Sequence, residues 1–269
     1  MLGLSPGIKT WCALHSIKLV GASRSKAAAE ESLEALGGRM NLRAQLVCGW
    51  IGVVATVSMF AAMWPLMHFL PPLDPMLTTA ETAAIYRANG TGIIIGGFIL
   101  LGAASAVMPF YSALALQLMR MEHPSRLWTY TLLTSSVMGF LPLLIAEMLF
   151  STAAFRPERP DEIIQALNDF GFIMFVGPSL PGTVQMLATA IPVLADRNPD
   201  PIFPRWVGYA NIWTAVAATP GCLVTLFKSG PFAWNGAISF WVAASAFSFW
   251  MFVNFWAMRR ALLRQMRAA

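Results

Sequence analysis

The acidic residue Glu147 is the first position whose type could support chemistry, because it lies inside the apolar run LLIAEMLF. A charge at the centre of a membrane span costs roughly 2.5–3.5 kcal/mol on insertion scales, so an acid there is a functional candidate by default. If the span begins near Trp128, Glu147 lies ~28 Å along it, close to the outer interface. Two interpretations stay open: a structural carboxylate that pairs with Arg156 or Arg87, and a group that transfers protons or binds a ligand.

His68, near the outer end of the first predicted span, is the second such residue. Together with Glu147 and two segments predicted to lie outside the membrane, it would form an outer vestibule, with Asp74 or Asp169 nearby. In a membrane enzyme that acts on a lipid or isoprenoid-like substrate, Glu147 would be the acid or base, and His68 or Asp74 would assist. We therefore take Glu147 and His68 as candidate catalytic residues. This hypothesis predicts that the groups lie within hydrogen-bond reach of each other.

Proline and glycine are concentrated at two places inside apolar runs. The segment 177–182 reads GPSLPG, and the segment 219–221 reads TPG. Proline removes an amide donor and glycine loosens a helix, so each segment should kink its helix or unwind a turn of it. Broken helices in transporters free backbone carbonyls to line a cavity, although proline and glycine in membrane helices also serve packing alone. The candidate ligand-binding residues around these breaks are Pro178, Pro181, Gln185, Asn211 and Pro220.

The shortage of histidine excludes several chemistries. Of the three histidines, His68 and His123 should be separated by most of the ~30 Å hydrocarbon core. They cannot share a metal or a haem, which argues against membrane di-iron enzymes and bis-histidine cytochromes. No lysine lies in the middle of a run and no GxxxxGK[ST] motif is present, which excludes a retinal Schiff base and a Walker-type ATPase. The cysteines have no CxxC spacing. We predict no metal site and no cofactor.

The composition indicates that lipid is the solvent of most of the chain. Of the 269 residues, 57% are hydrophobic and 12% are charged, whereas a soluble domain carries about 25% charged residues. The apolar residues are grouped in long runs, as membrane spans require. The net charge of +5 comes from cations at the ends of these runs rather than along one face. We therefore expect a lipid bilayer as a partner and no nucleic acid.

Six apolar runs are each near the ~20 residues that cross a hydrocarbon core of ~30 Å. Because backbone amides in lipid must be paired within their own segment, these runs are predicted to be helices. The predicted fold class is therefore all-α, a polytopic membrane bundle of six transmembrane helices at 40–269. Residues 1–39 are predicted to be a cytoplasmic tail that is disordered or precedes a true start at Met40. The predicted spans are 45–69, 91–118, 128–152, 171–195, 205–227 and 234–257.

Lysine and arginine are unevenly distributed between the two sides that six crossings define. One side holds the tail, the loops at 119–127 and 196–204, and the C-terminus, and it carries most of the cations. The cations of the other side are Arg87, Arg156, Arg159 and Lys228. The positive-inside rule therefore predicts that both termini are cytoplasmic. We expect the membrane to be the inner membrane of a bacterium.

The two long outer connections, 70–90 and 153–170, are alike. The first contains Thr78 and Glu81 at the spacing of a capping box, and the second has Pro-Asp-Glu ahead of an amphipathic stretch. Each is predicted to form a short amphipathic helix outside the membrane before the chain enters the next span, in the second case at Gly171.

Gly92 and Gly96 fit the small-xxx-small pattern. Small residues at this spacing let a neighbouring helix approach closely. In a bundle of six helices we interpret the pair as internal packing rather than as a dimer face.

Three stretches carry a likeness to a known family. The segments FPRWVGY at 203–209, FKSGPFAWNG at 227–236 and the stretch 155–169 resemble an uncharacterised bacterial family of six-span integral membrane proteins. The resemblance runs from about Met40 to the C-terminus, and residues 1–39 fall outside it. It implies six spans, and it implies no activity and no catalytic residues.

Three classes of function stay open. The first is binding or transport of a small, mostly apolar molecule, with the proline-broken fourth and fifth spans around its site. The second is the membrane enzyme described above. The third is an accessory or assembly subunit without a site of its own, which works with a membrane protein partner; a homo-oligomer is also open. A dry pocket would favour the first class, converging carboxylates the second, and solid packing the third.

Overall fold

The computed structural model describes residues 41–122 and 125–268. The predicted tail at 1–39 and His123 lie outside the described residues. The chain divides into two units, one formed by Met1–Ala44 with Arg264–Ala269 and the other by Gln45–Leu263. The features discussed below belong to the second unit.

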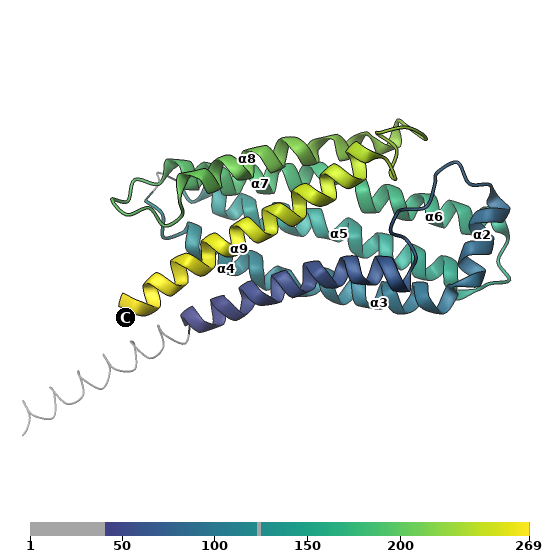
Figure 1. Cartoon of the computed structure of the whole chain (residues 1–269), viewed down its shortest axis with the longest axis horizontal. Helices are drawn as coiled ribbons and strands as arrows, with labels where there is room; N and C mark the ends of the chain where they lie inside the picture. Colours follow the sequence, from purple (N-terminus) through teal and green to yellow (C-terminus); the bar gives the residue numbers. More distant parts are fainter. Residues whose placement is uncertain (1–40, 123–124, 269) are drawn as a thin grey trace, which may run out of the picture. The chain divides into compact units, whose positions relative to one another are not determined.

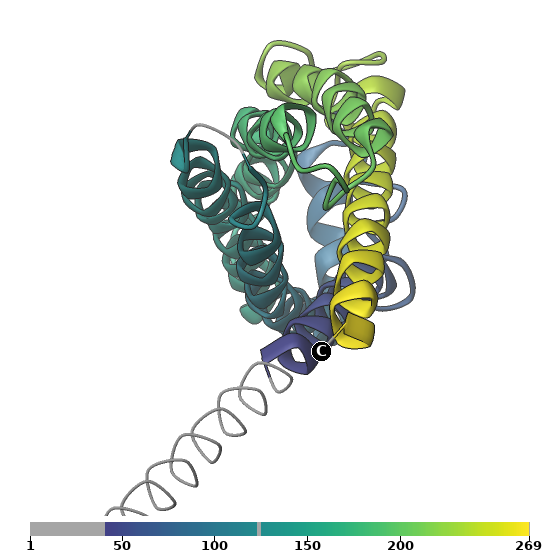
Figure 2. The ribbon, with the colours of Figure 1, turned by 90° about the vertical axis from the view of Figure 1, so that its left-hand side faces the viewer.

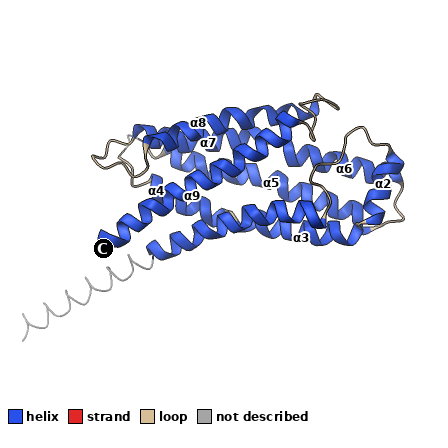
Figure 3. Ribbon diagram, viewed as in Figure 1, coloured by secondary structure: helices blue, strands red, loops and turns tan. Residues whose placement is uncertain are grey.

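All secondary structure in the described part of the chain is helical, which confirms the predicted all-α class (Figure 3). The first helix lies within Asn41–Leu66 and ends in the π-helical turn η1 (Ala62–Leu66). The elements that follow it are α2 (Thr79–Ala88), α3 (Gly90–Ala106), α4 (Met108–Leu118), α5 (Leu127–Phe155), α6 (Asp161–Val176), α7 (Ser179–Ala195), α8 (Arg205–Ala218), η2 (Thr219–Thr225), η3 (Ala237–Val242) and α9 (Ala243–Ala268).

Five helical segments of the described residues are long and apolar enough to cross a membrane. They are Asn41–Leu66, Gly90–Leu118, Leu127–Phe155, Asp161–Ala195 and Ala237–Ala268. By helix length and hydropathy the chain is therefore a multi-pass membrane protein. The predicted span at 205–227 is not among the five, because the α-helix α8 ends at Ala218 after 14 residues. Pro220 removes an amide donor there, and the chain tightens into the 3₁₀ helix η2.

Neighbouring helices of the second unit run alongside one another. α7 packs against both α5 and α8, and α3 packs against α5. The first helix packs against α9, where the ring centroids of Trp50 and Phe255 are 4.8 Å apart, and the two helices lie side by side in the end-on view of Figure 2. α2 and α6 pack together at one end of the helices, which we call the α2 end (Figure 1).

The second predicted surface helix is not a separate element. α6 begins at Asp161 and continues through Gly171 as far as Val176. Gly171 is a point of close approach rather than a turn, because a Cβ atom there would lie 2.4 Å from Cε1 of Phe150. The chain does not break at Gly171 but at Gly177 and Pro178, inside the segment 177–182 for which a helix break was predicted. One short surface helix, α2, is therefore separate from the helix that follows it.

The predicted capping box begins α2. The backbone N–H of Thr78 donates to Glu81 Oε2 (2.8 Å), and the backbone N–H of Glu81 donates to Thr78 Oγ1 (3.3 Å). The Thr78 hydroxyl also donates to Glu81 Oε2 (2.7 Å). The bond from the Thr78 N–H is the larger cause, and that from the hydroxyl the smaller, by which the pKa of the Glu81 carboxyl is held below its usual range. The box fixes where α2 starts.

Gly92 and Gly96 serve internal packing, as predicted. A Cβ atom on Gly92 would lie 2.4 Å from the carbonyl oxygen of Leu66, and one on Gly96 would lie 2.4 Å from Cγ of Met67. α3 can therefore lie directly against the end of the first helix. The side-chain amide of Asn89 also donates to Leu66 O (2.8 Å) and fixes the same contact.

Candidate functional site

The predicted break in the fourth apolar run separates α6 from α7. α6 ends at Val176, and its last amide contact is the N–H of Gly177 donating to Ile173 O (2.8 Å). Pro178 has no N–H to continue the helix, so α7 starts afresh at Ser179. Pro181 lies in the first turn of α7, where an amide has no acceptor within the helix, and it causes no further break.

The break in the fifth run lies against the first one. A Cβ atom on Gly221 would be 3.0 Å from Cβ of Ser179 and 3.3 Å from the carbonyl oxygen of Val176, so a larger residue would require its neighbours to shift. The Ser179 hydroxyl donates to the carbonyl oxygen of Thr219 (3.2 Å). The Ser239 hydroxyl donates to the carbonyl oxygen of Pro220 (3.3 Å). We call Val176–Ser179, Thr219–Gly221 and Ser239 the break junction.

Side-chain hydroxyls pair with backbone carbonyls at the break junction. The hydroxyls of Thr183 and Thr219 are 3.0 Å apart and add a further link between α7 and the end of α8. Unpaired carbonyls within a membrane cost several kcal/mol each, so these neighbouring hydroxyls let the helices break inside the apolar layer. The break junction is therefore held together by hydrogen bonds between α7 and the end of α8.

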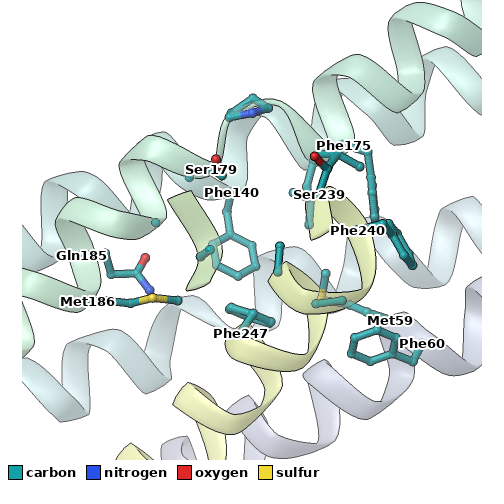
Figure 4. Close-up of a pocket in the computed structure, with 18 of the residues that line it drawn as sticks. Met59, Phe60, Phe140, Phe175, Ser179, Gln185, Met186, Ser239, Phe240 and Phe247 are labelled. Atoms are coloured by element: carbon teal, nitrogen blue, oxygen red, sulfur yellow. The ribbon is translucent and has the colours of Figure 1, made fainter. Parts of the chain in front are cut away.

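An apolar cavity of about 170 Å³ lies beside the break junction (Figure 4). Its walls come from the first helix, α5, α6, α7 and the η3–α9 segment, and none of the described residues that line it is charged. Small residues leave the space open: a Cβ atom on Gly182 would meet nothing within 4 Å, and one on Gly139 would meet its nearest neighbour at 3.9 Å. The apolar walls include Met59, Met63, Phe140, Leu143, Met186 and Phe247.

Gln185 is a buried polar residue in the wall of this cavity, with 2% of its surface exposed. Its Nε2 donates to the hydroxyl of Tyr111 (2.9 Å), which is itself buried. The Tyr111 ring stacks on Trp250 of α9, with centroids 5.6 Å apart. Gln185 is thus held in place by a network that reaches from α7 to α4 and α9.

The other sequence-predicted ligand-binding residues have different positions. Pro178 lines the cavity, whereas Pro181, Asn211 and Pro220 are not among the lining residues. The Asn211 side chain donates to Asn254 Oδ1 (3.3 Å) and accepts from the Trp250 indole N–H and from Asn254 Nδ2 (3.2 Å). Asn211 and Asn254 therefore form the interhelical link between α8 and α9.

Glu147 and His68 do not come together. Glu147 is 4% exposed, its Oε1 accepts a hydrogen bond from the Ser151 hydroxyl (2.9 Å), and its Oε2 has no partner among the described residues. Of the two interpretations, pairing with Arg156 or Arg87 is not seen among the described residues, and Arg87 contacts Asp161 Oδ1 at 2.6 Å. His68 is exposed, adopts a positive φ of 57°, and shares no hydrogen bond with Glu147 in the part of the chain that is described.

Aromatic side chains fill the region where the outer vestibule was predicted. Phe69 lies among Phe150, Phe172 and Tyr86, with ring centroids 5.0, 5.5 and 5.7 Å away. Trp234 stacks on Phe172 with centroids 5.7 Å apart and closes the cluster. Sequence reasoning missed this cluster, because aromatic residues far apart in the chain give no signal that they will meet.

Two polar groups are buried in this cluster: the hydroxyl of Tyr86, which donates to Asn168 Oδ1 (3.1 Å), and the indole N–H of Trp234, which donates to Leu73 O (2.8 Å). Burial, together with the nearby charge of Asp169, raises the pKa of the Tyr86 phenol well above its usual value. Tyr86 therefore acts as a neutral hydrogen-bond donor. Among the described residues, no group of three His, Cys, Asp or Glu side chains lies close enough to hold a metal ion.

The comparisons with known proteins add no identification to this geometry. No protein family, no curated protein and no solved structure matches the chain. The resemblance to a bacterial six-span family is therefore unsupported. What stands is a helical membrane protein with five candidate membrane-spanning helices and an apolar cavity beside two broken helices.

Proposed function

We propose that this protein binds a small apolar molecule in the cavity beside the break junction, as a membrane binding or transport protein. The observation that carries the proposal is an uncharged cavity of about 170 Å³ at the place where two proline-broken helices meet. An apolar cavity of about 150 Å³ in a soluble protein stays dry and takes up benzene. A space of this size fits one ring, a short branched chain, or the end of a longer chain.

The polar groups around the cavity disfavour an ion as the ligand. Ion sites in broken-helix transporters use carbonyls released by the unwound backbone. Here the carbonyls of Thr219 and Pro220 already accept hydrogen bonds from Ser179 and Ser239. No charged side chain among the described residues lines the cavity to balance an ion. The chemistry of the walls therefore suits a neutral, apolar molecule.

The membrane arrangement we propose has six crossings, with both termini in the cytoplasm of a bacterium. α8 runs beside α7, and α8 with η2 covers 205–225 without a gap (Figure 1). At the rises of α- and 3₁₀-helices this stretch is roughly 35 Å long, enough to cross a hydrocarbon core of ~30 Å. The uneven distribution of lysine and arginine then sets the orientation. A C-terminal tag that reagents reach from outside intact cells would contradict it.

The other two classes of function have less support. A membrane enzyme needs its acid and base within hydrogen-bond reach of a common substrate, and Glu147 and His68 share no such contact. An accessory subunit without a site of its own needs no cavity, whereas Gly139 and Gly182 leave one open. Binding of an apolar molecule accounts for the cavity directly.

The test uses a small alkyl diazirine, which loses nitrogen in light and inserts into nearby bonds. Labelled positions in the purified protein are located by peptide mass spectrometry. We expect labels on cavity residues such as Met59, Phe140 and Met186. Gly182→Leu should fill the cavity and remove these labels. Gly102→Leu is the matched control, because Gly102 is an exposed helical glycine with nothing within 4 Å of its Cβ position.

Two outcomes separate the possibilities. Labels that disappear in Gly182→Leu and persist in Gly102→Leu support the cavity as the binding site. Equal labelling of all three proteins, confined to exposed positions such as Phe98 and Trp213, would mean that the probe only samples the surrounding detergent or lipid.

A further inference from the structure

We propose that the ligand of this cavity carries a hydroxyl group, as an alcohol or a phenol, and that the Gln185 amide binds that hydroxyl. The inference rests on the proposed function, because it names the chemical class that the same cavity takes. The Gln185 side chain uses only one of its two hydrogen-bonding ends within the protein.

The Gln185 amide has one engaged end and one unengaged end. Its Nε2 donates to the Tyr111 hydroxyl at 2.9 Å. Its Oε1 accepts no hydrogen bond from any residue in the described part of the chain, although Gln185 is buried and lines the cavity. A donor group on a ligand that reaches Oε1 would add one hydrogen bond, which should strengthen binding about tenfold.

A hydroxyl matches Gln185 in either orientation of the amide. The hydroxyl of Tyr111 can donate or accept, so it can pair with either end of the amide. If Nε2 pairs with Tyr111, Oε1 faces the cavity and needs a donor; if Oε1 pairs with Tyr111, Nε2 faces the cavity and needs an acceptor. A ligand hydroxyl is both a donor and an acceptor, so it satisfies Gln185 in both cases.

The remaining polar groups of the wall leave Gln185 as the place for the hydroxyl. The Ser179 hydroxyl donates to Thr219 O at 3.2 Å. The Ser239 hydroxyl lies 3.0 Å from Phe232 O and 3.3 Å from Pro220 O. The Ser179 hydrogen is therefore used within the break junction, and the Ser239 hydrogen is used on one of these two backbone carbonyls.

The apolar walls determine how the ligand lies. Figure 4 shows the Gln185 amide at one end of the cavity beside Met186, with the rings of Phe140 and Phe247 next to it and Phe240 at the other end. The hydroxyl would lie at the Gln185 end, and the hydrocarbon body would extend along the rings towards Phe240. A charged head group is disfavoured, because no charged residue in the described lining can pair with it.

The test compares para-cresol with para-xylene as competitors of diazirine labelling in the purified full chain. The two molecules have nearly the same shape, and a methyl group in one replaces the hydroxyl of the other. Concentrations are measured in the detergent phase, so that the stronger partitioning of para-xylene is taken into account. We expect para-cresol to protect the cavity residues at about tenfold lower concentration than para-xylene.

Two variants locate the source of this preference. Gln185→Met keeps the length of the side chain and removes its hydrogen-bonding atoms, so the ratio between the protecting concentrations of para-xylene and para-cresol should fall from about ten to about one. Tyr111→Phe leaves both ends of the amide free, so the preference should be retained. If Gln185→Met does not fold, the wild-type preference and its retention in Tyr111→Phe still decide the question.

Failure of this inference and failure of the proposed function give different results. Equal protection by both molecules in the wild type, or a preference that survives Gln185→Met, would contradict the inference. The cavity would then bind apolar molecules without a hydrogen bond from Gln185 to a ligand hydroxyl. If neither molecule protects, the proposed function itself is wrong. A third competitor, a long-chain isoprenoid alcohol, distinguishes a membrane lipid from a small free alcohol: it protects only if a tail can extend out of the cavity.

Discussion

The α2 end and the break junction use glycine in opposite ways. At the α2 end, Gly92, Gly96 and Gly171 each have a neighbouring atom 2.4 Å from the position that a Cβ would occupy, so glycine brings helices into contact. Beside the junction, Gly182 has nothing within 4 Å and Gly139 only a distant neighbour, so glycine leaves space. The same residue type closes one region of the protein and opens the other.

The size of the partner side chains explains the difference. The glycines of the α2 end face Phe150, Met67 and the backbone of Leu66, and aromatic rings fill what space remains. Gly139 faces the backbone of another glycine, since the nearest atom to its Cβ position is the backbone nitrogen of Gly182 at 3.9 Å. A void forms where small residues meet small residues, and tight packing forms where they meet large ones.

The largest change in stability should come from removing Phe69, the central aromatic ring of the α2 end. Phe69→Ala deletes a buried side chain that contacts three other rings, and we expect it to lower the free energy of unfolding by about 3–5 kcal/mol. The variant should also make Phe150 and Phe172 accessible to the diazirine probe, because it opens a second cavity. Thermal unfolding in detergent measures the first effect, and peptide mapping measures the second.

Phe98→Ala is the control for this variant, because the Phe98 side chain is 75% exposed. A loss of stability in Phe98→Ala as large as that in Phe69→Ala would show that the aromatic cluster is not specially packed.

Replacing one glycine by alanine in each region should change the free energy of unfolding by a smaller amount, and in opposite directions. Gly92→Ala places Cβ 2.4 Å from the carbonyl oxygen of Leu66, and we expect overpacking to cost about 1–3 kcal/mol. Gly182→Ala adds its methyl group to open space within α7, where alanine favours the helix by up to ~1 kcal/mol. The unfolding temperatures should therefore move in opposite directions. If both fall, the space beside Gly182 is not open.

The smallest expected effect is a change in the stability of α2 with pH. The pKa of the Glu81 carboxyl is lowered in the folded protein, so its stabilisation of α2 is complete above the unfolded pKa and is lost as pH falls through the folded value. Since a free glutamate titrates near pH ~4.3, the loss should occur below about pH 4. Hydrogen exchange at the start of α2 should then accelerate relative to α7, which contains no charged residue. Glu81→Gln should abolish this dependence, and an unchanged pH response in that variant would contradict the assignment.

Local patterns in the sequence predicted local features of the structure. The length of apolar runs predicted six membrane-crossing segments, five of which correspond to long apolar helices, and proline with glycine predicted the break at 177–178. The spacing of Thr78 and Glu81 predicted the capping box. Of the residues predicted to bind a ligand, Pro178 and Gln185 line the cavity. Each of these features depends on residues within a few positions of one another.

Features that depend on distant partners could not be predicted in this way. Gly171 looked like the start of a span, but α6 runs through it, and the glycine instead leaves room for the ring of Phe150 on a neighbouring helix. Arg87 looked like a partner for Glu147, yet the fold brings it to Asp161. Asn211 looked like a cavity residue, whereas the position of Trp250 and Asn254 makes it a link between helices.

The loss of labelling in the Gly182→Leu variant is the most direct test of the account. The space beside the break junction should accept a small apolar molecule, and a leucine at 182 should fill that space, because its Cβ atom would meet nothing within 4 Å. We predict that diazirine labelling of Met186 is strong in the wild type and in Gly102→Leu, and absent in Gly182→Leu. Labelling of Met186 that is equally strong in Gly182→Leu would contradict this account.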